Sequence, residues 1–146
     1  MSEEESIKES INLSFESVSS LSNKLFDYIS KISYLNDNYE MDNEYKEKYA
    51  FYRELLINSI KKKDIREFVK SYKKLRMILD KVIDAIDSKR INDIEYRLVI
   101  DKVNELKILI NNKISEYNNY VISYDNLKRG LFSRNKEKER FDLISL

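Results

Sequence analysis

The chain has 146 residues, so one domain with a continuous core is expected, and neither a metal ion nor a disulfide is needed to complete it. Pro is absent and Gly occurs once, which disfavours sheets with many tight hairpins, and the absence of Cys and His excludes disulfides, thiolate or Ser-His nucleophiles and imidazole-ligated metal sites. With 27 basic and 26 acidic residues the net charge is +1, so no overall field draws the protein onto a polyanion.

A first helix is predicted to begin at Ser2, because Ser2 and Glu5 three positions later form a capping-box pattern. Its apolar residues then alternate steps of three and four, a 3.5-residue period typical of a helix packed lengthwise on near-parallel neighbours. An Asn-Asp-Asn cluster at 36–38 is a candidate end, although Tyr39 fits the continuing stripe. That stripe consists of Val18, Leu21, Leu25, Tyr28, Ile32, Leu35 and Tyr39.

Two shorter helices are predicted in the middle of the chain. The first ends at the three lysines 61–63, which suit the negative end of the helix dipole. Asp64, with Glu67 three positions on, is the expected N-cap of the next helix, whose pattern breaks around 87–90. The two stripes consist of Tyr45, Tyr49, Tyr52, Leu56 and Ile60, and of Ile65, Phe68, Tyr72, Leu75, Leu79, Val82 and Ile86.

A last helix is predicted from Asn92, again with a glutamate three positions later, at Glu95. Only Lys113 interrupts its stripe, and the aliphatic stem of that lysine can lie along the core while its ammonium reaches water. Gly130, the single glycine, is expected at the C′ position that ends the helix. The stripe consists of Tyr96, Val99, Val103, Leu106, Ile110, Lys113, Tyr117, Tyr120, Tyr124 and Leu127.

Together these elements predict an all-α protein, an elongated antiparallel four-helix bundle in long–short–short–long order with coiled-coil-like packing. The outer helices, of roughly 35 residues, would each span roughly 50 Å at about 1.5 Å per residue. The helical bundle domain is expected over residues 1–130, and residues 131–146 form a basic C-terminal tail. A three-helix alternative fuses the middle pair across residues 61–64, but it buries a charged turn.

Carboxylates in a bundle can hold a di-metal centre, but that design uses Glu-x-x-His motifs, and the chain has no histidine. The candidate carboxylates fall mostly outside the apolar stripes, which favours a solvated helix face. They are Asp80, Asp84, Asp87 and Asp101. No catalytic residue, cofactor or metal is therefore expected, and the protein is predicted not to be an enzyme.

The eleven tyrosines are the most unusual feature of the composition. Core packing, with each hydroxyl at the rim of the bundle, is the favoured interpretation, and an aromatic groove for a partner peptide is the alternative. The tyrosines that this interpretation places on the seams of the bundle include Tyr28, Tyr72, Tyr96, Tyr117, Tyr120 and Tyr124.

The basic C-terminal end is the best candidate for binding a partner. Its local charge over 128–140 is about +4, opposed only by Glu137 and Glu139. It can touch an anionic membrane surface, where each basic residue gives about 1 kcal/mol, or bind RNA, or form a solvated tail, which is the favoured interpretation. The candidate residues are Lys128, Arg129, Phe132, Arg134, Lys136, Lys138, Arg140 and Phe141.

Several motifs in the C-terminal third resemble those of a known family. They are the run Asp-Lys-Val-Asn-Glu-Leu-Lys-Ile-Leu-Ile-Asn-Asn-Lys-Ile at 101–114, then Tyr117-Asn118-x-x-Val121-x-x-Tyr124-Asp125, Leu131-Phe132 and Phe141-Asp142, with the segment 25–32 as a weaker match. This order resembles the C-terminal half of LemA family proteins, whose last helix ends in a Tyr-Asn-x-x-Val-x-x-Tyr-Asn run before a tail with Gly-Phe and a late Phe-Glu.

The resemblance implies a long four-helix bundle and a membrane-linked role, and it carries over no catalytic residues. No segment of these 146 residues matches the family's N-terminal membrane anchor or its tail prolines, and Asp125 replaces the second Asn. These departures put the membrane-linked role in doubt.

The residues themselves favour a non-enzymatic interaction protein, of adaptor or inhibitor type, that binds another protein through a helical face or the basic tail. The alternative is a LemA-like peripheral bundle on an anionic membrane surface. Nucleic acid is less favoured, and RNA binding would need a basic stripe on one face of the bundle.

The cellular location and the oligomeric state follow from weaker signals. No run approaches 18 apolar residues, and the N-terminus is acidic where a signal peptide is basic, so the cytoplasm is the expected location. Seams this regular can also pair between chains, so a homo-oligomer is left open.

Overall fold

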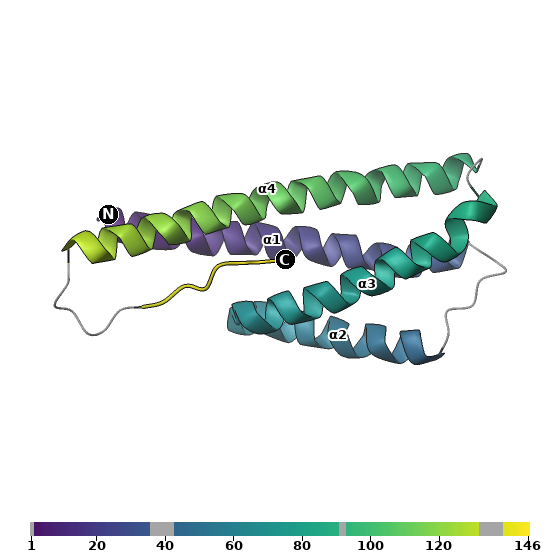
Figure 1. Ribbon diagram of the computed structural model, residues 1–146, viewed down its shortest axis with the longest axis horizontal. Helices are drawn as coiled ribbons and strands as arrows, with labels where there is room; N and C mark the ends of the chain where they lie inside the picture. The colour runs from purple at the N-terminus through teal and green to yellow at the C-terminus, as the bar shows by residue number, and fades with distance from the viewer. Residues whose placement is uncertain (1, 36–42, 91–92, 132–138) are drawn as a thin grey trace.

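The four predicted helices are present in a computed structural model of the protein, which confirms the all-α four-helix architecture (Figure 1). The structure describes residues 2–35, 43–90, 93–131 and 139–146, apart from the side chains of 87–90 and 131. No strand occurs in these segments. The helices are α1 (Glu3–Leu35), α2 (Asn43–Lys62), α3 (Ile65–Arg90) and α4 (Ile94–Leu131).

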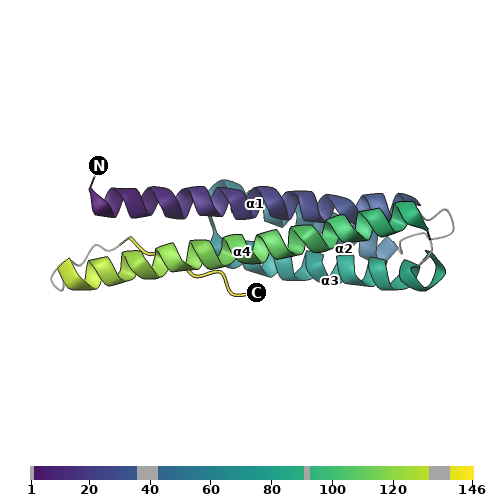
Figure 2. The same cartoon turned by 90° about the horizontal axis from the view of Figure 1, so that it is seen from above.

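The long helices α1 and α4 run antiparallel beside each other along most of their length, and the shorter α2 and α3 form an antiparallel hairpin (Figures 1 and 2). The interface between α1 and α4 is the most extensive, followed by that between α2 and α3 and then that between α1 and α3. Because α2 touches mainly α3, it is the most peripheral helix, and Leu56 is its only fully buried apolar residue.

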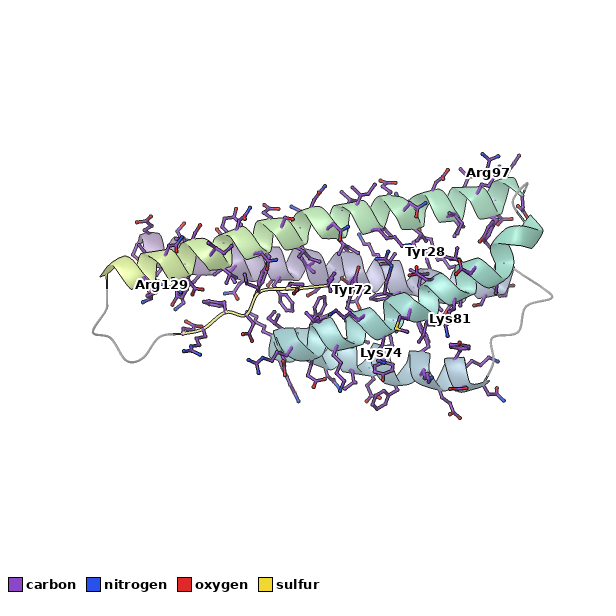
Figure 3. All side chains as sticks on the ribbon, in the orientation of Figure 1. Tyr28, Tyr72, Lys74, Lys81, Arg97 and Arg129 are labelled. Atoms are coloured by element: carbon purple, nitrogen blue, oxygen red, sulfur yellow. The ribbon has the colours of Figure 1, made fainter. Side chains whose placement is uncertain are left out.

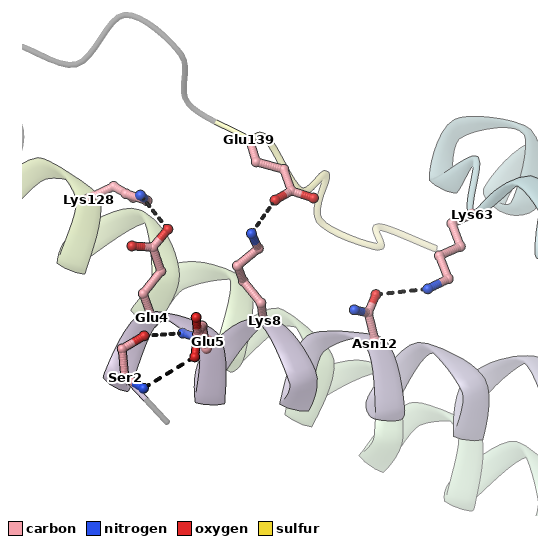
Figure 4. Close-up of polar contacts among 8 residues, drawn as sticks. All are labelled: Ser2, Glu4, Glu5, Lys8, Asn12, Lys63, Lys128 and Glu139. Atoms are coloured by element: carbon pink, nitrogen blue, oxygen red, sulfur yellow. Dashed lines mark hydrogen bonds and ion pairs between the residues drawn. The ribbon is translucent and has the colours of Figure 1, made fainter.

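Three of the four helices, α1, α3 and α4, begin with a side chain that accepts a hydrogen bond from a backbone N–H group of the first turn. At α1, the Glu5 amide donates to Ser2 Oγ over 3.2 Å and the Ser2 amide donates to Glu5 Oε2 over 3.4 Å, which confirms the capping box (Figure 4). At α3, the Glu67 amide donates to Asp64 Oδ1, as predicted.

The start of α4 differs by one residue from the prediction. The residue that caps it is Asp93, whose Oδ1 accepts from the Tyr96 amide over 3.3 Å, so the choice of Asn92 as the first residue was wrong. Asn92 itself lies outside the described residues. Asn and Asp are equally good N-caps, and two of them in succession leave the start ambiguous by one position.

A tight turn separates α2 from α3, so the three-helix alternative is wrong. Lys63 has a φ of 54°, in the left-handed region. Its amide donates to the Ile60 carbonyl over 3.2 Å, and the Asp64 amide donates to the Ser59 carbonyl over 2.9 Å. This pair of bonds is a Schellman motif, which normally places glycine where Lys63 stands.

The core follows the predicted seams, most closely on α3, where all seven predicted residues are buried. On α1 the buried face is wider than the predicted stripe, because this helix packs on both α4 and α3. Phe15, Phe26 and Ile29 are buried there although the stripe omits them. Tyr39, the last predicted residue of that stripe, lies outside the described residues.

Aromatic rings connect three of the helices at the centre of the core. Phe15 of α1 packs edge-on against Phe68 of α3 with ring centroids 5.4 Å apart, and Phe26 packs edge-on against Tyr72 at 5.0 Å. Phe15 also lies 6.2 Å from Tyr117 of α4. Core use is confirmed for the buried Tyr72, Tyr96, Tyr117 and Tyr124, while Tyr28 and Tyr120 are half-buried.

Two details of α4 bear on the predictions. Lys113 is half-buried with its Nζ 3.1 Å from Glu116 Oε2, and the buried Ile114 fills the core beside it. The prediction that Gly130 ends the helix in a left-handed conformation is wrong, because α4 continues to Leu131 and no glycine has a positive φ. Glycine can also occupy the last turn of a regular helix, so the position of the single glycine did not locate the end of α4.

Candidate interaction surfaces

The predicted basic tail is described only in part. Phe132, Arg134, Lys136 and Lys138 lie outside the described residues. The other four predicted residues are Lys128 and Arg129 at the end of α4, and Arg140 and Phe141 in a final extended segment, 139–146, which we call the C-terminal segment.

Lys128 takes part in holding the bundle together. Its Nζ lies 2.5 Å from Glu4 Oε1 and 5.7 Å from the centroid of the Tyr124 ring, and its side chain is only 12% exposed (Figure 4). The contact ties the start of α1 to the end of α4. Arg129 and Arg140, in contrast, are exposed and have no ion pair within the described part of the chain.

The C-terminal segment lies against the bundle, so the expectation of a solvated tail is wrong for residues 139–146 (Figure 1). Phe141 packs edge-on against Tyr124 with centroids 5.1 Å apart, and Ile144 is 2% exposed. At its start, Lys8 Nζ lies 2.6 Å from Glu139 Oε2, and this contact raises the pKa of Lys8 (Figure 4).

Side chains of α4 hold the backbone of this segment. The Asn118 amide group donates from Nδ2 to the Ile144 carbonyl over 2.9 Å, and the Ile144 amide donates to Asn118 Oδ1 over 2.8 Å. The Tyr117 hydroxyl donates to the Asp142 carbonyl over 2.8 Å. Burial raises the pKa of Tyr117 well above its usual value, so at neutral pH this hydroxyl stays protonated and acts as a donor.

A cavity of about 290 Å³ lies between the C-terminal segment, α1, α4 and the turn that joins α2 to α3. Ile11, Phe15 and Phe141 form part of its apolar lining, and Lys63 bonds from Nζ to Asn12 Oδ1 at its rim (Figure 4). The cavity mixes both signs of charge and holds no reactive group apart from the protonated Tyr117 hydroxyl, so we assign no chemistry to it.

Among the described residues, most of the basic side chains that form no ion pair lie on the exposed side of the α2–α3 hairpin. Lys70, Lys73, Lys74 and Lys81 follow one another on α3 at steps that return to the same helical face, and all four are exposed. Arg66 lies on this face as well, but its Nε is 3.7 Å from Asp142 Oδ2. The stretch 61–76 holds two acidic residues, Asp64 and Glu67, and eight basic ones, namely Lys61, Lys62, Lys63, Arg66, Lys70, Lys73, Lys74 and Arg76. Sequence reasoning assigned only the three lysines of this stretch, as a helix end. A charge count for each predicted helix would have revealed the rest.

Beside this stripe lies a small groove between α2 and α3, with a volume of about 90 Å³, which we call the hairpin groove. Its apolar wall and floor are made by Tyr45, Tyr52, Met77 and Ile78, and its rim by Lys48, Lys74 and Lys81. Figure 3 labels the last two along α3. The sequence pattern placed Tyr45 and Tyr52 in the core. Both are half-buried because α2 is peripheral, and their outer edges face the groove.

The remaining candidate groups are engaged or scattered. Asp80 lies 3.4 Å from Lys107 Nζ and 3.5 Å from Arg76 Nε, while Asp84 and Asp101 are exposed, and the side chain of Asp87 is not described. Within the described segments, no group of three or more His, Cys, Asp or Glu could hold a metal ion. None of the described helices is long and apolar enough to cross a membrane.

Comparison with known proteins adds no family to this description: no family model, no curated protein and no solved structure matches the chain. The resemblance to LemA proteins stays a prediction that none of these comparisons supports.

Proposed function

We propose that the protein is a non-enzymatic interaction protein that binds another protein through the exposed surface of the α2–α3 hairpin. The observation that carries the proposal is the basic stripe of α3, in which Lys70, Lys73, Lys74 and Lys81 form no ion pair in the described part of the chain, beside a groove with apolar walls. Complementary charge steers a partner to such a surface and selects its orientation, while the apolar groove contributes burial.

The helical face is a better candidate than the basic tail. Lys128 is bound to Glu4, and Phe141 is packed on Tyr124, so two of the predicted tail residues already have partners within the chain. By contrast, Lys61, Lys62, Lys70 and Lys73 make no ion pair in the described part of the protein. A partner can therefore engage these lysines without first breaking a contact within the bundle.

The test is an affinity capture from a lysate of the native host, with three forms of the tagged protein. The first is wild type, the second has Lys61, Lys62, Lys70 and Lys73 changed to Gln, and the third has four other exposed basic residues, Lys24, Lys31, Arg97 and Arg129, changed to Gln. The two variants carry the same change in net charge. We expect a stoichiometric protein that is lost from the second form and kept by the third. A protein captured equally by all three would contradict the proposal.

RNA binding is a second candidate, because the structure does contain a basic stripe on one helical face. The same capture separates the two functions. If the retained material is removed by ribonuclease and carries a strong nucleic-acid absorbance, the stripe binds RNA and its salt dependence should be steep. The α1 helix, with six acidic residues against three basic ones, weighs against a long polyanion.

The LemA-like alternative, a peripheral bundle on an anionic membrane surface, is tested with vesicles. Salt-sensitive binding to phosphatidylserine-containing vesicles, weakened when Lys136, Lys138 and Arg140 are neutralised, would support it. Binding to neutral and anionic vesicles alike, or to neither, would leave the protein-binding proposal in place.

A further inference from the structure

We infer that the hairpin groove receives an acidic segment of a partner protein, which inserts one apolar side chain between Tyr45, Tyr52 and Met77. This inference rests on the proposed function and names the chemistry of the partner. The groove lies between helices rather than in the core, and three lysines surround its apolar wall.

The size of the groove fits a single side chain. Its volume of about 90 Å³ is well below the roughly 300–1,000 Å³ of sites that enclose a small molecule. Ile78 forms a buried floor, and Met77 beside it is 55% exposed. Methionine is flexible and polarizable, so it adapts to an inserted aliphatic or aromatic group. An anchoring residue of a peptide is therefore the expected occupant.

The charges at the rim select an acidic segment. Lys48 is already paired with Glu44 at 2.9 Å, whereas Lys74 and Lys81 have no carboxylate within ion-pair distance in the described part of the chain. Lys81 Nζ donates to the Tyr45 hydroxyl over 2.6 Å and lies 5.1 Å from the centroid of that ring, so its position is set. Lys81 is near enough to Glu44 to contribute to the lowered pKa of that carboxyl, but Glu44 is paired directly with Lys48. Neither Lys74 nor Lys81 therefore has a direct ion-pair partner, and two carboxylates of a partner protein would supply one for each.

The spacing of the two lysines predicts the spacing of those carboxylates. Lys74 and Lys81 are seven positions apart on one helix, which corresponds to two turns and about 10 Å along the axis. An extended peptide covers about 10 Å in three residues, and a helix covers it in seven. The apolar anchor should lie between the two acidic residues in either case.

The aromatic rings of the groove are less suited to stacking with nucleotide bases. The Tyr52 ring packs edge-on against Phe51 with centroids 5.1 Å apart, and Lys48 and Lys81 both lie over the Tyr45 ring. Base stacking on single-stranded RNA needs an open ring face. These contacts favour a peptide over RNA as the occupant of this groove.

The test is a selection from a displayed library of random dodecapeptides on the full chain. We expect enriched peptides with two acidic residues, three or seven positions apart, on either side of a Leu, Met or Phe. The synthetic consensus peptide should lose at least about tenfold in affinity for the double variant K74E/K81E. The affinity of the peptide should change by less than about threefold for K70E/K73E, which makes the same change in net charge on the same helix but outside the groove. Met77→Ser should also weaken binding.

Several outcomes would overturn the inference. They are a selection that enriches nothing, enriched peptides without an acidic excess, and equal losses for the two double variants. All four substituted lysines are exposed, and circular dichroism checks that both variants keep their helices. The two proposals fail separately. If the partner from the lysate is lost from the Gln variant of the hairpin but kept by K74E/K81E, the groove is not the site and the proposed function stands.

Discussion

The Asn118 side chain binds both backbone groups of Ile144: its Nδ2 donates to the carbonyl over 2.9 Å and its Oδ1 accepts from the amide over 2.8 Å. One primary amide thereby does for Ile144 what a neighbouring strand does in a sheet. The isoleucine side chain is buried at the same point. This pairing makes the C-terminal segment part of the folded structure.

Replacing Asn118 by Ala should release the segment. Two backbone groups of a buried residue lose their partners, which should lower the free energy of unfolding by about 1–3 kcal/mol. Hydrogen exchange at the Ile144 amide should accelerate far more than exchange at core amides of α4. Asn119→Ala is the matched control, because Asn119 is exposed and makes no such bonds. An unchanged exchange rate at Ile144 would show that Asn118 does not hold the segment.

Lys63→Gly should stabilise the protein. The left-handed conformation of Lys63 costs about 1–2 kcal/mol for a residue with a Cβ and little for glycine. Lys63→Ala loses the same contact to Asn12 but keeps the unfavourable backbone, so it is the reference. We expect the Gly variant to be about 1 kcal/mol more stable than the Ala variant by chemical denaturation. Equal stabilities would argue against the observed turn.

Gly130→Ala should also stabilise the protein. Gly130 lies in the last turn of α4 without a positive φ, and nothing lies within 4 Å of an added Cβ. Alanine is favoured over glycine in a helix by up to about 1 kcal/mol, which corresponds to a rise in Tm of up to about 2–4 °C for a chain of this size. A lower Tm would instead support the left-handed C′ position that the sequence suggested.

Stability should fall in alkaline solution because buried tyrosines resist ionisation. Burial raises the pKa of Tyr117, with a further contribution from Asp142, and burial also raises the pKa of Tyr72 and Tyr124. The stabilising contribution is full below the unfolded-state pKa of about 10, and it is lost as the pH rises through the higher folded values.

Urea denaturation at about pH 8 and pH 11 measures this loss. Tyr117→Phe should lower the free energy of unfolding at pH 8, since the hydrogen bond to Asp142 is removed. It should also make the free energies of unfolding at the two pH values differ by less than they do in wild type. Tyr34→Phe, at a side chain that is 86% exposed, should leave the difference as in wild type. If Tyr117→Phe lost as much stability between pH 8 and pH 11 as wild type does, ionisation of Tyr117 would not be a cause of that loss.

The helices were predictable because each one carries its own signal. The alternating steps of three and four on α3 marked seven positions that are all buried, although Ser71 and Ile78 are buried as well, and Asp64 and Ser2 marked helix starts with carboxylate and hydroxyl caps. The start of α4 was misplaced because Asn92 and Asp93 are both good N-cap residues. The end of α4 was misplaced because Gly130 was expected in a left-handed conformation, which it does not adopt.

The candidate surfaces were harder to predict because they depend on which helices touch. The hydrogen bond between Asn118 and Ile144 joins residues that are 26 positions apart, and no local sequence pattern predicts it. Tyr45 and Tyr52 follow a helical stripe like core residues, yet they line a groove because α2 packs mainly on α3. The basic stripe can be found in the sequence by counting charges helix by helix, but the net charge of +1 for the whole chain gives no indication of it.

The pairing of α1 with α4 has a consequence for how the chain is made. Of the four helices, α1 is synthesised before the others and finds its main partner in α4, the last of them, while α2 and α3, joined by one tight turn, can associate as soon as both have emerged. Until α4 is synthesised, the apolar face of α1 is covered only where α3 reaches it. Among the four helices, that face is therefore the one that most needs a chaperone during synthesis.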